Sequence, residues 1–298
     1  MNEKGPEDFI SLCQPDQNKS CGACCGLYNW QDHSRAAVTS LLRERTSVFL
    51  SSSLPSPRPS PPHGRGGDGD PLGSAPRDTG NLHEYRRLGE AGAPAPKLLE
   101  EIYNCQFLGF LDQQERRVGC LLHPSMHDGA DLRDLCLYGK ELCAGHFCPS
   151  FTYLTRMERM AVIRALDDWY LYGLVITDID FVKEFLREAQ DRLGDALRMQ
   201  HLMDAGVRAG LLAFLSLKEC WEFASRDNRL GKYYFSHSEY RIARIDYEKK
   251  WKISPSRYDK ILVSLASELA TKADVLEAES LIEERIEAFV QACRGASL

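Results

Sequence analysis

The sequence lacks the segments that would direct a chain into or across a membrane. Residues 1–6 are polar and contain no apolar core of the kind that a signal peptide needs. The longest strongly apolar run, residues 211–217, is far shorter than the roughly 20 residues that span a bilayer. We therefore expect a cytoplasmic protein with no membrane partner.

The sequence also lacks an excess of positive charge and the common catalytic motifs. Lys and Arg number 37 against 43 Asp and Glu, a net charge of -6, which argues against nucleic acid as a partner. No GxSxG, P-loop or HExxH motif is present. Residues 64–69 match GxGxxG in letters, but no strand-like run precedes them and no helix-like run follows. Whether the chain is an enzyme stays open.

Cysteine is what the sequence has in abundance. The chain contains 11 cysteines, an odd number, so a complete set of intramolecular disulfides is impossible. The cytoplasm keeps thiols reduced, and grouped cysteines in a reducing compartment are most often metal ligands. The candidate ligands are the eight cysteines within residues 21–148, namely Cys21, Cys24, Cys25, Cys105, Cys120, Cys136, Cys143 and Cys148.

Two pairs among these cysteines have a spacing typical of metal ligands. Two residues separate Cys21 from Cys24, so both sulfurs can converge on one ion, and four residues separate Cys143 from Cys148. Glycine beside the first pair lets the backbone pass close to a metal. Thiolate sulfur is the soft ligand that holds zinc and iron–sulfur clusters. The pattern therefore predicts zinc or an iron–sulfur cluster as the cofactor.

The adjacent Cys24 and Cys25 limit how such a site is built. Neighbouring side chains on an extended backbone point in different directions, so these two do not both face one tetrahedral ion in a simple way. Either they serve two metal sites, or one of them ligates while the other packs or bridges. Eight cysteines fill two four-cysteine sites, or one four-iron cluster with four left over.

Further cysteines and histidines lie outside this group. Cys220 and Cys293 fall on helical apolar stripes, where we expect them to pack as small apolar side chains. Cys13 and His146 stay open as additional ligands.

The apolar pattern divides the chain near residue 150. We expect residues 1–150 to form an irregular, cysteine-rich metal domain with a small β-hairpin made by residues 106–111 and 117–122. Residues 51–80, of which nineteen are Pro, Gly or Ser, are expected to be a disordered insertion. We expect residues 151–298 to form an all-helical domain. The predicted fold class is α+β, mostly α.

Helical periodicity supports this division. Apolar residues at helical spacing predict a short helix at residues 34–50 and six helices after residue 155. Thr155 and Glu158 form the pattern of a capping box at the start of the first of the six, and Asp178 precedes the second. Residues 240–251 are predicted as the fourth.

The cysteine segments resemble the bacterial cysteine-cluster family called CxxCxxCC, or the YkgJ type. The segments that carry the resemblance are Ser20-Cys21-Gly22-Ala23-Cys24-Cys25-Gly26, Cys105-Gln106-Phe107-Leu108 and Gly119-Cys120-Leu121-Leu122-His123-Pro124. The family is described as a zinc- or iron-chelating domain, and the resemblance covers roughly residues 20–150. It implies seven metal ligands, with Cys136 as a further candidate: Cys21, Cys24, Cys25, Cys105, Cys120, Cys143 and Cys148. The family name implies one more cysteine before Cys21, and Cys13 is the upstream candidate.

The resemblance also implies an alternative function. The family includes relatives of the flagellin lysine N-methylase, whose chemistry is associated with an iron–sulfur cluster and S-adenosylmethionine. An iron–sulfur-dependent enzyme that modifies a protein is therefore one alternative to a metal-binding protein. A scaffold with structural zinc, whose helical half binds a protein partner, is another. The sequence names neither the substrate nor the partner.

Overall fold

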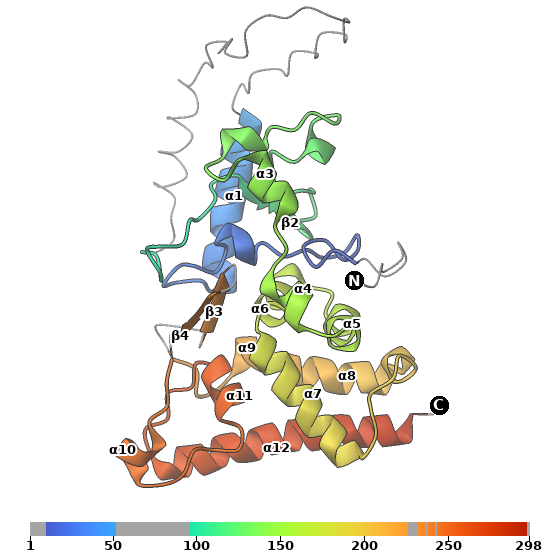
Figure 1. Ribbon diagram of the computed structural model, residues 1–298, viewed down its shortest axis with the longest axis vertical. Helices are drawn as coiled ribbons and strands as arrows, with labels where there is room; N and C mark the ends of the chain where they lie inside the picture. Colours follow the sequence, from blue (N-terminus) through green and yellow to red (C-terminus); the bar gives the residue numbers. More distant parts are fainter. Residues whose placement is uncertain (1–9, 52–95, 226–231, 236–237, 242, 297–298) are drawn as a thin grey trace, which may run out of the picture.

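The protein is mostly helical, which confirms the coarser part of the predicted fold class (Figure 1). The predicted insertion lies outside the described residues, apart from Ser51. No helix in the described parts of the chain is long and apolar enough to cross a membrane. The computed structural model describes residues 10–51, 96–225, 232–235, 238–241 and 243–296.

The N-terminal half is organised around helix α1 (Arg35–Ser51) and a hairpin of strands β1 (Leu108–Phe110) and β2 (Val118–Cys120). The strands pair antiparallel, as the sequence predicts. Helix α1 packs directly on β1. Glycine is required at position 109, because a Cβ there would lie 2.6 Å from Oγ1 of Thr46 on α1. This close contact fixes the hairpin, and with it Cys120, against the helix.

The segment after the hairpin is more helical than the sequence indicates. Pro124 and Pro149 each occupy the first turn of a short helix, where a backbone N–H would have no partner within the helix. These short helices carry or flank the last three predicted ligands. They are η3 (Pro124–Met126), η4 (Arg133–Leu135), α3 (Gly139–Gly145) and α4 (Pro149–Tyr153).

The C-terminal half consists mainly of helices, and its long helix α12 packs on two of them, crossing α7 and lying along α8 (Figure 1). The capping box of Thr155 and Glu158 is confirmed, and Asp178 caps α7. The first predicted helix is two helices, because the chain breaks between Ala165 and Trp169. The elements are α5 (Arg156–Ala165), α6 (Trp169–Ile176), α7 (Ile179–Leu193), η5 (His201–Met203), α8 (Ala205–Leu215), α9 (Leu217–Cys220), α10 (Tyr247–Trp251), α11 (Asp259–Ser264) and α12 (Lys272–Gly295).

The expectation of an all-helical C-terminal half is wrong. Strands β3 (Lys232–Phe235) and β4 (Ser238–Arg241) pair antiparallel, so the helix predicted at residues 240–251 is present only as α10. The run Tyr-Tyr-Phe in β3 is rich in aromatic residues, which favour strands over helices. Asp246 then caps α10 by accepting a hydrogen bond from the amide of Lys249 at 3.0 Å.

The two halves share an apolar cluster. Tyr170 and Leu174 of α6 pack with Leu27 and Tyr28 from the cysteine-rich half. The Tyr28 hydroxyl donates a hydrogen bond to the carbonyl oxygen of Tyr170 at 2.9 Å, and both residues are buried. The predicted division into two domains near residue 150 stays a prediction. The parts of the chain before and after this position pack against each other through the shared apolar cluster.

Candidate metal centre

Cys24 and Cys25 lie in one turn of 3-10 helix, η2 (Ala23–Cys25). Gly26 ends the turn with a φ of +81°, in the left-handed region. A Cβ at Gly26 would also lie 2.7 Å from the carbonyl oxygen of Tyr103, so both conformation and space require glycine. The two cysteines have largely different neighbours: Cys24 lies beside Cys148, whereas Cys25 lies near Cys120, Cys136 and Cys105 and also near Cys13.

The neighbours of Cys24 form what we call the first thiol group, made of Cys13, Cys21, Cys24 and Cys148. The amide of Cys21 donates a hydrogen bond to the carbonyl oxygen of Cys13 at 2.8 Å, which joins these two loops. Burial of the sulfur and the nearby Cys148 thiol raise the pKa of Cys13 to about 11, although the residue as a whole is exposed. Cys13, which the sequence leaves open, therefore lies with three predicted ligands.

The neighbours of Cys25 form the second thiol group, made of Cys25, Cys105, Cys120, Cys136 and Cys143. The sulfurs of Cys136 and Cys143 lie 3.6 Å apart, and Cys136 also accepts a hydrogen bond from the Cys105 thiol. The amide of Cys105 donates to the carbonyl oxygen of Cys25 at 2.9 Å. Burial raises the pKa of Cys25 to about 12, and the nearby thiols of Cys120, Cys13 and Cys136 act in the same direction. Cys25 therefore also lies near Cys13 of the first thiol group.

One thiol in each group is easier to ionise than an ordinary cysteine. A hydrogen bond from Cys24 lowers the pKa of Cys148 to about 7. Hydrogen bonds from Cys105 and Cys143 lower the pKa of Cys136. Metal ligation requires thiolate, so the thiols of both groups release protons when a metal ion binds.

The sulfurs are gathered but are not closed around a point. Among the described residues, no group of three or more His, Cys, Asp or Glu side chains is arranged to hold a metal ion. All eleven cysteines are free thiols, so disulfides do not compete for the sulfurs. The donor chemistry fits a soft metal ion, and the side chains must rotate to complete a coordination shell.

A buried cation lies beside the second thiol group. Arg45 on α1 is only 5% exposed, and its Nη1 donates a hydrogen bond to the carbonyl oxygen of Cys105 at 2.9 Å. Burial lowers the pKa of Arg45 to about 10, while the Cys105 and Cys25 thiols act in the opposite direction. Sequence reasoning missed this residue. The available signal was its position four residues after Leu41 and four before Phe49, on the apolar face of α1.

Three nearby histidines, of which the sequence leaves only His146 open as a ligand, bond to other groups or are exposed. His127 Nε2 bonds to the carbonyl oxygen of Leu121 at 2.7 Å, His123 Nδ1 bonds to the Ser125 hydroxyl at 2.8 Å, and His146 is exposed. The expectation that Cys220 is buried is wrong: its helix, α9, presents it to solvent.

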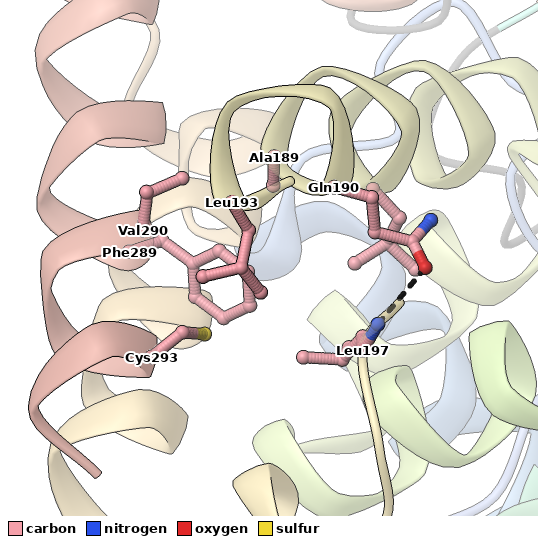
Figure 2. A pocket seen from close by; sticks show the side chains of 8 residues that line it. Ala189, Gln190, Leu193, Leu197, Phe289, Val290 and Cys293 are labelled. Carbon is pink, nitrogen blue, oxygen red and sulfur yellow. Dashed lines mark hydrogen bonds between the residues drawn. The ribbon is translucent and has the colours of Figure 1, made fainter. Parts of the chain in front are cut away.

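Cys293 is buried on α12, as the sequence predicts. It lines an apolar crevice between α7 and α12, which Figure 2 shows together with the hydrogen bond from the Leu197 amide to Gln190. The crevice leaves no room for the centre of a water molecule. It is therefore part of the packed core of the helical half and not a binding site.

Comparison with known proteins adds no relative: no protein-family model, curated protein or solved structure matches the chain. Membership of the CxxCxxCC family stays a prediction that rests on the cysteine motifs.

Proposed function

We propose that this chain is a metal-binding protein that holds one ion in each thiol group. The observation that carries the proposal is that nine cysteines, spread from Cys13 to Cys148, gather around the Cys24–Cys25 turn, with Cys24 beside Cys148 and Cys25 beside Cys120 and Cys136. Buried free thiols pack as small apolar side chains and have little reason to cluster, since S–H is only a weak donor. Convergence of so many free thiols favours ligation.

The spacing of the sulfurs supports a single ion, for which we propose zinc, over a four-iron cluster. In a tetrahedral site with Zn–S bonds of about 2.3 Å, neighbouring sulfurs lie about 3.8 Å apart. The sulfurs of Cys136 and Cys143 lie 3.6 Å apart. A four-iron cluster binds each thiolate through a different iron and so needs wider spacing. The iron–sulfur enzyme alternative rests on the family resemblance alone.

The proposed role of the metal is structural. Four cysteines close a tetrahedral zinc site and leave no position for a substrate. Cys148 and Leu12 belong to the apolar core of the helical half, and Cys21 and Cys24 pack against that core. An ion in the first thiol group would therefore tie the N-terminal loops to the helical half. Such a protein requires a reducing compartment, such as the cytoplasm.

Elemental analysis of protein purified without oxygen tests the proposal. We expect about two equivalents of zinc per chain and no visible absorption band from iron–sulfur. Cys220→Ser is the matched control, because Cys220 is exposed and lies outside both groups. Less than about a tenth of an equivalent of zinc and iron together would contradict metal binding. Stoichiometric iron together with a visible absorption band would show that the bound group is an iron–sulfur cluster and not zinc.

A further inference from the structure

Cys136 and Cys143 are close enough to react with each other. Their sulfurs lie 3.6 Å apart, whereas a disulfide bond is about 2.05 Å long, so bond formation needs a small approach. We propose that this pair is an oxidative modification site, at which a peroxide converts the two thiols into an intramolecular disulfide. The inference depends on the separation of the sulfurs and on access from solvent, and it does not require bound metal.

The segment that joins the two cysteines can accommodate this approach. Leu137 and Leu142 are both 63% exposed, and of residues 137–142 only Tyr138 packs against the apolar core. Gly139 has a φ of +69°, and a Cβ at this position would meet only Asp134 within 4 Å. A segment with few buried contacts shifts at small cost in free energy. By contrast, Cys148 in the first thiol group is packed in the core of the helical half.

Access from solvent also favours Cys143. Cys143 is half-buried, between the exposed Leu142 and Ala144, whereas Cys105 and Cys136 are buried. The two sulfurs share a proton across their contact, and when that proton lies on Cys136 the Cys143 thiolate attacks the peroxide. The O–O bond breaks, and the leaving oxygen takes up a proton and departs as water, which gives a sulfenic acid at Cys143. The Cys136 sulfur then attacks the Cys143 sulfur, the S–O bond breaks, and a second water leaves. The two thiols lose two electrons and two protons, and hydrogen peroxide is reduced to two waters.

Peptide mapping of the full-length protein after treatment with stoichiometric hydrogen peroxide tests the inference. Trypsin cleaves after Lys140, so Cys136 falls in residues 134–140 and Cys143 in residues 141–156. We expect these two peptides to be cross-linked, with fragment ions that assign the bond to Cys143 and not to Cys148. Cys143→Ser should reduce this cross-link more than tenfold, and Cys220→Ser should leave it unchanged. A dominant bond from Cys136 to Cys105, or a sulfinic Cys143 with Cys136 still alkylatable, would overturn the inference.

Two samples separate this inference from the proposed metal binding. One is treated with a chelator, and the other is supplied with zinc. If both proposals hold, the chelator-treated protein forms the cross-link and zinc slows its formation at least fivefold. If metal binding fails, both samples form the cross-link at the same rate, and the inference still stands. Absence of the cross-link from the chelator-treated sample overturns the inference whatever the metal content.

Discussion

Gly173 lies on α6 directly against Tyr28, so Gly173→Ala tests whether the two halves are packed together as one core. A Cβ at this position would lie 3.0 Å from two ring carbons of Tyr28 and closer still to its hydroxyl oxygen. Tyr28 must move, and its hydrogen bond to Tyr170 is then lost, at a cost of about 1 kcal/mol. Overpacking adds about 1–3 kcal/mol, and the helix propensity of alanine returns about 1 kcal/mol. We expect a net loss of about 1–3 kcal/mol in the free energy of unfolding.

Urea unfolding followed by far-UV circular dichroism measures this change. The double variant Tyr28→Phe/Gly173→Ala should be more stable than the sum of the single variants predicts, by about 1 kcal/mol, because removal of the hydroxyl relieves the closest contact. Gly145→Ala is the matched control, since nothing lies within 4 Å of a Cβ at Gly145. Wild-type stability of Gly173→Ala, or strict additivity in the double variant, would refute the reasoning.

We make three further predictions about other parts of the chain. Arg35→Ala removes paired hydrogen bonds to Asp168 and to Glu219 and should lower the free energy of unfolding by about 1–2 kcal/mol, a value reduced for solvent screening because the three side chains are about a third exposed. Urea unfolding measures this loss, and an unchanged free energy of unfolding would contradict the prediction. Burial raises the pKa of Cys13 and Cys120 to about 11, so between pH 9.0 and 11 the folded state keeps protons that the unfolded chain releases. The melting temperature of metal-free protein should therefore fall as the pH rises through this range, and a melting temperature independent of pH would contradict the prediction. Deletion of residues 51–80 should leave metal content and melting temperature unchanged, since loop-closure entropy varies slowly with length; loss of metal contradicts it.

Local signals in the sequence predicted much of the fold. The capping box of Thr155 and Glu158 and the aspartate cap of α7 depend on nearby side chains and backbone, and both were predicted correctly. The β1–β2 hairpin was also predicted, from two short apolar segments on either side of a polar turn. The short helix that begins at Pro149 was not predicted, because proline is found both after helix ends and at the first position of a helix.

What depends on distant contacts could not be read from the sequence. The pattern left open whether Cys24 and Cys25 serve one site or two, and their division depends on where Cys148 and Cys120 lie in the fold. The place of Arg45 beside the second thiol group depends likewise on the packing of α1 against the segment that contains Cys105. The exposure of Cys220 follows from the orientation of a four-residue helix, for which periodicity carries little information.

The number of zinc ions per chain, counted by native mass spectrometry in variants of the two adjacent cysteines, tests the central claim most directly. Cys24→Ser leaves three thiols in the first group and should reduce the count from two to one. Cys25→Ser leaves four thiols in the second group and should keep both ions, whereas Cys25→Ser/Cys105→Ser should keep only one. Loss of both ions from Cys24→Ser, or retention of both, would contradict a separate ion in each thiol group.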